Sequence, residues 1–163
     1  MSEKDFPVTL AIRELQKHDV KYTPFLFAYQ EKGGTSHSAQ ELGVNEHIVI
    51  KTLIMETEDK SPLVVLMHGD LQVSTKQLAR HMGVKTISPC KPEVADRHSG
   101  YQVGGTSPFG TRKTLPIYME ESILQSPLIY INGGKRGYLV SLDPQEIVRV
   151  LKPHLVSVGV PAT

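Results

Sequence analysis

The chain of 163 residues contains one cysteine, no tryptophan and few other aromatic residues. With Cys90 alone it can form neither an internal disulfide nor a cysteine-cluster metal site. It has no run of the roughly 18 to 20 apolar residues that a membrane span needs, and its start, MSEKDFPVTL, lacks the apolar centre of a signal peptide. We therefore expect a cytoplasmic protein that does not enter a membrane.

Motifs that bind metals or nucleotides are also missing. The seven histidines include no HxH or HExxH spacing, and the glycine-rich stretch GGTSPFG matches neither GxGxxG nor GxxxxGK. We expect no metal and no other cofactor. The histidines outside the N-terminal helix and the C-terminal segment are scattered over different expected elements: His37, His47, His68, His81 and His98.

Two residues could in principle serve as nucleophiles, but their surroundings do not favour it. Ser107 precedes a proline without the GxSxG elbow of a hydrolase. Cys90 lies in SPCKP with no base that can be assigned to it. We therefore expect neither residue to act as a nucleophile.

Composition predicts one globular domain spanning residues 1–163, because 39% of the residues are hydrophobic and 21% are charged. The net charge of +1 hides an uneven distribution. Residues 1–60 carry seven Lys or Arg against ten Asp or Glu, a balance of −3, whereas residues 85–136 carry seven against four, a balance of +3. The basic part is typical either of a local site for an anionic partner or of ordinary solvated turns.

Hydrophobic periodicity predicts an α+β fold in which strands predominate. Thr9 and Ser74 are expected to cap helices, and Gly43 and Gly83 to end them. Asp143 is expected to cap the last helix. The expected helices are residues 10–18, 38–43, 74–83, 91–100 and 143–151, and the expected strands are 22–28, 47–55, 62–70, 114–119, 127–132 and 137–142, the last two forming a hairpin.

The segment GYQVGGTSPFGTRKTLP, residues 100–116, contains several glycines and prolines between expected strands. Glycine permits a positive φ and close approach of another group, and proline fixes φ, so the segment has a specified shape. It is either a tight connection or a place where a ligand lies against the backbone. Two pairs of cations accompany these glycines. Arg112 and Lys113 lie in the last part of the segment, and Lys135 and Arg136 lie in a second glycine turn.

Lys51 in HIVIKTLIM is the main anomaly of the expected sheet. Strand alternation places Lys51 on the same face as Val49, Leu53 and Met55. A buried ammonium without a partner is costly, so Lys51 must reach an edge, pair with an acid or face a ligand cleft. In a cleft, a fixed cation suits an anion or a polarised carbonyl.

Taken together, IVIKTLIM, GYQVGGTSPFGTRKTLP and IYINGGKRG resemble, in this order and spacing, the YbaK family of aminoacyl-tRNA deacylases. This family is related to the editing domain of bacterial prolyl-tRNA synthetases. The resemblance covers nearly the whole chain and implies a compact α+β domain with a mixed, partly barrel-like sheet. It implies removal of a wrong amino acid from tRNA, most simply Cys from Cys-tRNA(Pro). Charged tRNA would be the partner, with prolyl-tRNA synthetase as a second one and DNA excluded.

The resemblance also implies roles for individual residues. Lys51 corresponds to the essential lysine, and the substrate's own thiol would attack the ester. The terminal adenosine and its ester would lie against backbone N–H groups of the glycine loop. Substrate-binding positions are Tyr29, Thr52, Gly104, Gly105, Thr106, Ser107, Pro108 and Asn132, and tRNA backbone contacts are Arg112, Lys113, Lys135 and Arg136.

Three departures from the YbaK branch affect the expected specificity. Asn132 replaces a serine, Leu139 replaces an acid, and His37 stands where a pocket aromatic is missing. An Ala-tRNA(Pro) deacylase of the sister branch therefore stays open, with His37 as a helper for the attacking water. A non-catalytic tRNA- or synthetase-binding module and a small-molecule binder are further alternatives.

Overall fold

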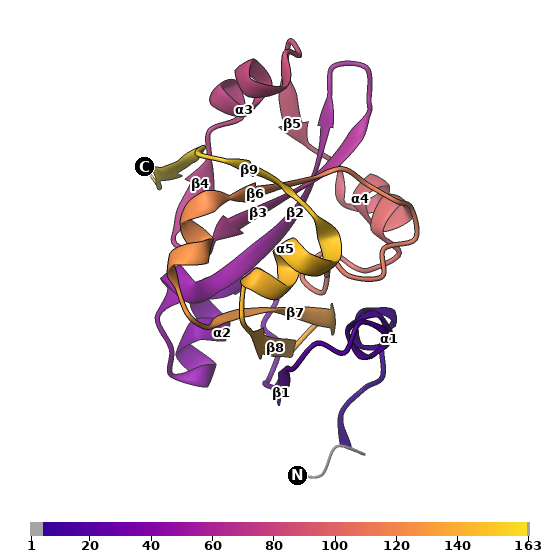
Figure 1. The fold of residues 1–163 in the computed structure, drawn as a ribbon, viewed down its shortest axis with the longest axis vertical. Helices are drawn as coiled ribbons and strands as arrows, with labels where there is room; N and C mark the ends of the chain where they lie inside the picture. Colours follow the sequence, from indigo (N-terminus) through magenta and orange to yellow (C-terminus); the bar gives the residue numbers. More distant parts are fainter. Residues whose placement is uncertain (1–4, 163) are drawn as a thin grey trace.

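A computed structural model describes residues 5–162 and shows helices packed around a mixed sheet (Figure 1). The α-helices are α1 (Leu10–Lys17), α2 (Gly34–Leu42), α3 (Thr75–Met82), α4 (Pro92–Ser99) and α5 (Gln145–Leu151), with short 3-10 helices at Glu46–Ile48 and Glu121–Gln125. The strands are β1 (Thr23–Leu26), β2 (Val49–Thr57), β3 (Pro62–His68), β4 (Leu71–Val73), β5 (Ile87–Pro89), β6 (Ile117–Glu120), β7 (Ile129–Lys135), β8 (Tyr138–Leu142), β9 (His154–Val156) and β10 (Gly159–Pro161).

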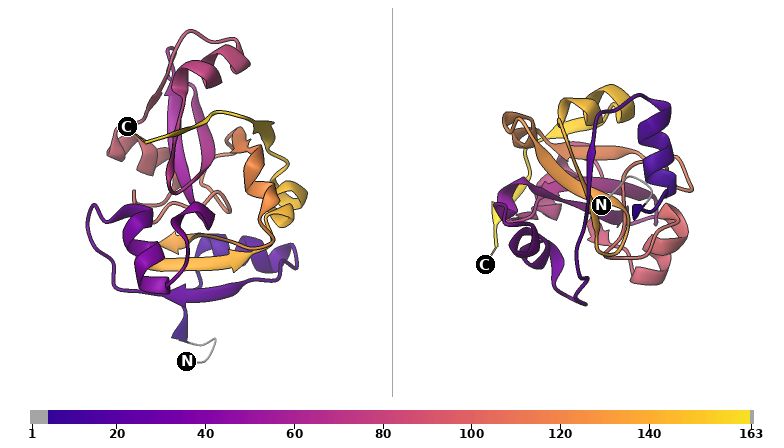
Figure 2. Two further views of the ribbon diagram at one scale, coloured as in Figure 1. Left: turned by 90° about the vertical axis from the view of Figure 1, so that its left-hand side faces the viewer. Right: turned by 90° about the horizontal axis from the view of Figure 1, so that it is seen from below.

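The main sheet has the order β1-β8-β7-β2-β3-β6-β9, and β5 also pairs with β2. Pairing is parallel for β2 with β7, β3 with β6 and β6 with β9, and antiparallel elsewhere. The long β2–β3 hairpin stands upright while β7, β8 and β1 cross its lower end (Figure 2). The expected α+β fold with a mixed sheet is thus confirmed.

Strand β2 is flanked on one side by two different strands with an interruption between them. Its first two residues pair with β7, and its last three pair with β5. Residues 51–53 pair with β3 on the other side but have no strand neighbour at the interruption within the described chain. The sheet is therefore open beside Lys51.

Local sequence signals account for most helix boundaries. The Thr9 hydroxyl accepts from the N–H of Ile12, and the Ser74 hydroxyl accepts from the N–H of Gln77, as expected for N-caps. Gly43 and Gly83 end α2 and α3 in the left-handed conformation.

Helix α5 begins slightly later than expected. Pro144 occupies the N-cap position of α5, and Asp143 lies one residue before it. The Asp143 carboxylate still accepts from the N–H of Gln145 at 2.9 Å. The predicted capping contact therefore exists, but the helix begins at Gln145 because the proline precedes it.

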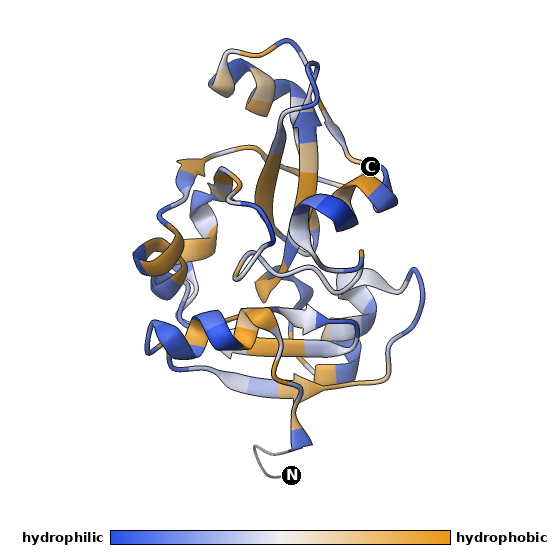
Figure 3. Ribbon diagram, turned by 90° about the vertical axis from the view of Figure 1, so that its right-hand side faces the viewer, coloured by the Kyte–Doolittle hydropathy of each residue, from blue (hydrophilic) through white to orange (hydrophobic). Residues whose placement is uncertain are grey.

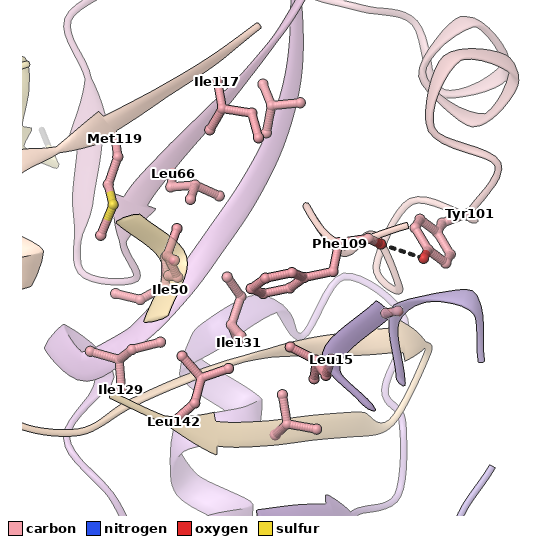
Figure 4. Packing of buried hydrophobic residues seen from close by; sticks show 14 of the residues in the cluster. Leu15, Ile50, Leu66, Tyr101, Phe109, Ile117, Met119, Ile129, Ile131 and Leu142 are labelled. Carbon is pink, nitrogen blue, oxygen red and sulfur yellow. Dashed lines mark hydrogen bonds between the residues drawn. The ribbon is translucent and has the colours of Figure 1, made fainter. Parts of the chain in front are cut away.

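Two hydrophobic clusters lie on opposite faces of β2 and β3. One contains Ile50, Ile54 and Leu66, together with Phe109 (Figure 4). The other contains Met55. The central strands are largely hydrophobic, and the surrounding helices mix hydrophilic and hydrophobic residues (Figure 3). Alternate residues of β2 thus lie in different clusters, as the sequence predicts.

Four three-residue strands were not expected: β4, β5, β9 and β10. Each is too short to show a period of two, and β4 pairs with β10 across a large sequence separation. No helix in the part of the chain that the structure describes is long and apolar enough to span a membrane.

Candidate active site

Lys51 is half-buried on β2, and its ammonium donates a hydrogen bond to the backbone carbonyl of Leu71 in β4. Burial lowers the pKa of Lys51, and the nearby carboxylates of Glu46 and Asp70 oppose that shift. No carboxylate of a described residue lies within 4.0 Å of this ammonium. Since an ammonium has three donors, Lys51 keeps donors that a substrate oxygen can use.

The two acids near Lys51 are fixed by other partners. Glu46 accepts from the hydroxyl of Thr35 at 2.7 Å. Asp70 lies 2.9 Å from the Nδ1 of His47. These contacts hold negative charge near Lys51 without neutralising it directly.

The backbone of Thr52 faces the interruption in the sheet, and its side chain lies on the face opposite that of Lys51. Its hydroxyl oxygen is buried and is the one buried side-chain polar atom without a hydrogen-bond partner among residues 5–162. The carbonyl of Ile54 faces β5, where it accepts from Cys90 N at 3.1 Å. Because alternate residues of a strand point their backbone groups the same way, the N–H and C=O of Thr52 face the interruption too.

Asn132 follows the end of the pairing between β2 and β7. The parallel register pairs Val49 with Tyr130 and Ile50 with Ile131, and Asn132 is the next residue of β7, on the side of the sheet opening at Lys51. The amide of Asn132 donates to the carbonyl of Gly104 at 3.2 Å. Asn132 thus connects the Lys51 side of the site to the glycine segment.

The glycines of residues 100–110 are required by the protein's own packing. A Cβ on Gly105 would lie 2.6 Å from the backbone nitrogen of Arg136, and one on Gly104 would lie 2.8 Å from the hydroxyl of Tyr29. Gly104 also has φ +92, a conformation that favours glycine. Another part of the chain therefore fills the space that the sequence suggested for a ligand.

The rest of the glycine segment is anchored in the core. Phe109 is fully buried, and its carbonyl accepts from the hydroxyl of Tyr101 at 2.6 Å (Figure 4). Ser107 is also fully buried, and its hydroxyl accepts from the N–H of Phe109 at 3.1 Å. These contacts give Ser107 a role in shaping the segment.

Some backbone donors of the segment have no acceptor. The N–H groups of Gly104, Thr106 and Ser107 donate to no acceptor among the described residues, whereas Gly105 N donates to Gln102 O at 2.8 Å. Thr106 and Ser107 are followed by Pro108, and all three residues are buried. Adjacent free N–H groups on a rigid backbone can stabilise a carbonyl oxygen that gains negative charge.

The four cations next to the glycine segment differ in their contacts. Arg136 donates from Nε to the carbonyl of Val103 at 2.9 Å, and its guanidinium lies 5.1 Å from the centre of the Tyr29 ring. The Nζ of Lys113 lies 3.0 Å from the Nδ1 of His98. Arg112 and Lys135 are exposed, and their side chains make no hydrogen bond or ion pair with described residues.

Comparisons with known proteins show the family of this chain. The family model for the aminoacyl-tRNA editing domain matches residues 31–150. A protein of Enterococcus faecalis, named as a candidate Cys-tRNA(Pro)/Cys-tRNA(Cys) deacylase, is 31% identical over 86% of both chains. The chain belongs to the aminoacyl-tRNA editing domain family.

The editing domain also occurs within larger enzymes. Proline–tRNA ligase of Ligilactobacillus salivarius is 33% identical over 61% of this chain, but the match covers only 17% of that ligase. A solved structure described as a candidate trans-editing enzyme for prolyl-tRNA synthetase has a TM-score of 0.80 at 21% identity, covering 94% of this chain and 98% of that one. At this identity the structure supports the shared fold.

Two of the positions that depart from the YbaK branch, Leu139 and His37, have contacts of their own within the protein. Leu139 is buried against Val49 and is paired with Asn132 across β7 and β8. His37 lies in α2, with Nε2 2.7 Å from the carbonyl of Ala28 and 3.6 Å from Glu41. This ring nitrogen is therefore already engaged within the protein.

Cys90 is poorly suited to nucleophilic attack. Burial and the neighbouring Glu56 raise the pKa of its thiol to about 11, so the thiol is protonated at neutral pH. This agrees with the low expectation for Cys90 as a nucleophile.

Two surface hollows lie away from Lys51. One of about 400 Å³ is lined by residues including Phe6, Tyr22 and Tyr138, and one of about 320 Å³ is lined by residues including Pro108 and Lys113. Neither is lined by Lys51 or Thr52. The candidate site is thus defined by unpaired polar groups along the open part of β2.

Several residues that shape the site were not found from the sequence. The carbonyl of Leu71 holds Lys51, and the carboxylate of Asp96 accepts from the N–H of Val103 at 3.0 Å. A backbone carbonyl carries no sequence signal. Asp96 could have been considered as an acid in the helix before the glycine segment, but nothing in its spacing marks it.

Proposed function

We propose that this editing-domain protein is a free-standing deacylase that acts in trans on mischarged tRNA, with Cys-tRNA(Pro) as its substrate. The observation that supports it most is that two neighbouring residues keep unused polar groups at the opening of the sheet: the ammonium of Lys51 has a single hydrogen bond on one face, and the buried hydroxyl of Thr52 has none on the other. A buried polar group without a partner is costly, which is consistent with a partner supplied by the substrate.

In this proposal the aminoacyl ester lies between β2 and the glycine segment. Lys51 donates to the ester carbonyl or a terminal phosphate oxygen, and the N–H groups of Thr106 and Ser107 stabilise the carbonyl oxygen as it gains charge. Thr52, Asn132 and Tyr29 contact the terminal adenosine or the amino acid. The glycine backbone thereby faces the substrate on one side and the β7–β8 turn on the other.

The chemistry is proposed to use the substrate's own thiol. Its sulfur attacks the ester carbonyl carbon, the bond from that carbon to the ribose oxygen breaks, and the thiol proton ends on the ribose oxygen. The product is a cyclic thioester, which water can open. This route agrees with the protonated thiol of Cys90 and the buried hydroxyl of Ser107, because it needs neither as a nucleophile.

The tRNA backbone would be held by exposed cations. Arg112, Lys113 and Lys135 lie next to the glycine segment and are free of carboxylate partners among the described residues. Phosphate contacts of this kind fix position without reading sequence. We also propose that the protein associates with prolyl-tRNA synthetase.

The test is a panel of mischarged tRNAs. Cys-tRNA(Pro), Ala-tRNA(Pro) and Pro-tRNA(Pro) are incubated with the protein, and release of each amino acid is followed. Fast release of Cys with Pro-tRNA(Pro) left intact supports the proposal. Preferential release of Ala would instead support the sister activity, and binding of tRNA without release would support a non-catalytic module.

A further inference from the structure

Arg136 is exposed, but its side chain is tied to the glycine segment. Its Nε donates to the carbonyl of Val103 at 2.9 Å, and its guanidinium lies over the ring of Tyr29 at 5.1 Å from the ring centre. Tyr29 in turn packs against Gly104. One planar side chain therefore contacts both the backbone of the segment and the aromatic ring that covers it.

Asn132 makes a second link between the same two regions. Its amide nitrogen donates to the carbonyl of Gly104, and its amide oxygen accepts from the N–H groups of Gly134 and Lys135 at 2.7 and 3.1 Å. The shape of the β7–β8 turn and the position of Gly104 are thus set by the same side chain. Successive carbonyls of the segment, at Val103 and Gly104, are held by the turn.

The opposite side of the segment is fixed as well. The carboxylate of Asp96 in α4 accepts from the N–H of Val103 at 3.0 Å. Close packing of Gly105 on the backbone of Lys135 and Arg136 leaves no room for the segment to move toward the turn. The hydrogen bonds from Arg136 and Asn132 oppose movement of the segment away from the β7–β8 turn.

The neighbouring cation behaves differently. Lys135 is exposed like Arg136, but its side chain contacts no acceptor among the described residues. Lys135 and Arg136 are adjacent in sequence, yet only Arg136 has its donor and its planar face engaged by the protein. This difference separates their roles.

We propose that Arg136 is a positioning residue that holds Val103 and Gly104 of the glycine segment in the shape that receives the ester, while Lys135 contacts tRNA phosphate. This assigns Arg136 a role other than the phosphate contact expected from the sequence, and it rests on the proposed deacylase function. The free N–H groups of Thr106 and Ser107 follow the held residues after one intervening residue, Gly105. A shift of these donors by about 1 Å can reduce a rate by on the order of 100-fold.

Two kinds of measurement test the role of Arg136, using the full-length protein with Arg136→Ala, Arg136→Lys and, as the matched neighbour, Lys135→Ala. The first is hydrogen–deuterium exchange of residues 100–110, which needs no substrate. The second is single-turnover deacylation of Cys-tRNA(Pro) across enzyme concentrations and a salt series. Exchange reports the shape of the segment even if no mischarged tRNA is a substrate, so failure of this inference is distinguishable from failure of the proposed function.

We expect Arg136→Ala to speed exchange in residues 100–110 and to lower the rate at saturating enzyme by roughly 10- to 100-fold, with the salt dependence of binding unchanged. Arg136→Lys should not rescue the rate, because lysine keeps the charge but has neither Nε–H nor a planar face. Lys135→Ala should leave exchange unchanged and reduce the salt dependence.

Three results would each overturn this inference. They are wild-type exchange in Arg136→Ala, full activity in Arg136→Lys, and a reduction of salt dependence in Arg136→Ala equal to that in Lys135→Ala. The second would show that charge alone suffices. The third would show that Arg136 is a phosphate contact like its neighbour.

Discussion

Residues 51–53 of β2 and residues 103–109 of the glycine segment both border the candidate active site, but they use their polar groups differently. In the segment, the carbonyls of Val103 and Gly104 and the hydroxyl of Ser107 have partners within the protein, and the groups left without an acceptor among the described residues are backbone N–H groups. In β2, the hydroxyl of Thr52 has none, and the ammonium of Lys51 has a single one.

This difference indicates a division of tasks between the two regions. Polar groups that are satisfied within the protein fix a shape, whereas unsatisfied groups beside an opening are available to a ligand. We therefore expect changes in β2 to affect the reaction more than the fold. Changes in the glycine segment should affect both.

The largest expected effect on activity comes from Lys51→Ala. Removing a donor to a developing oxyanion typically costs on the order of 100- to 1,000-fold in rate. The free energy of unfolding should change by no more than about 1 kcal/mol, because Lys51 is only half-buried and makes one hydrogen bond to a carbonyl. Deacylation rates and urea unfolding check both statements, with Lys51→Arg as the charge-preserving comparison. Wild-type turnover by Lys51→Ala would show that Lys51 takes no part in the reaction.

Gly105→Val should reduce stability and activity together. A side chain there meets the backbone of Lys135 and Arg136 within 2.8 Å, and overpacking of this kind costs about 1–3 kcal/mol. Thermal unfolding and the deacylation rate are measured on the same preparation. Gly83→Ala is the control, since Gly83 has φ +71 but open space around it, so it should lose stability alone. Unchanged activity and stability in Gly105→Val would show that the segment tolerates movement.

Replacing Arg112, Lys113 and Lys135 together with Ala should weaken binding to every tRNA alike. The slope of log affinity against log salt should fall by roughly 0.7 to 0.9 for each phosphate that the variant no longer neutralises. The preference for one amino acid over another should stay the same, because phosphate contacts carry no information about it. Binding to tRNA(Pro) and to an unrelated tRNA across a salt series checks this. A wild-type slope would mean that tRNA approaches by another face.

The smallest effect concerns His68, a fully buried residue of β3 whose ring nitrogens lie 2.7 Å from the carbonyl of His47 and 2.8 Å from the hydroxyl of Ser122. Burial lowers the pKa of His68 in the folded protein. The unfolded chain, with a pKa of about 6.5, therefore binds more protons below that pH. Stability should be full above about pH 6.5 and fall as the pH drops below it, until the folded pKa is passed.

Urea unfolding at pH 7.5 and 5.5 measures this decrease, which is at most about 1.4 kcal/mol because pH 5.5 lies one unit below the unfolded pKa. His68→Gln provides the comparison, because it removes this titration and leaves the other histidines. Equal pH dependence in both proteins would show that His68 is not the group responsible.

Much of the fold was predictable from short-range patterns. The caps at Thr9 and Ser74 and the alternation in β2 are local signals, and all three are confirmed. The strands β4 and β10 were missed because pairing between Leu71–Val73 and Gly159–Pro161 is set by distant contacts.

The site was predictable in part. Lys51 stood out because a cation on an apolar strand face is unusual, and its half-burial and lowered pKa agree with that anomaly. The sequence could not show why residue 105 must be a glycine, because the group that approaches it is the backbone at Arg136, 31 residues away in the chain. Nor does the sequence reveal that Arg136 and Lys135 differ in their contacts.

The most direct test of the division between the two regions is the single-turnover rate of Cys release from Cys-tRNA(Pro), measured against enzyme concentration. It separates the rate at saturation from the concentration that gives half of that rate. We predict that Lys51→Ala lowers the saturating rate with little change in the half-saturating concentration, and that the Arg112, Lys113 and Lys135 triple variant does the reverse. Equal changes of both quantities in the two variants would contradict the account.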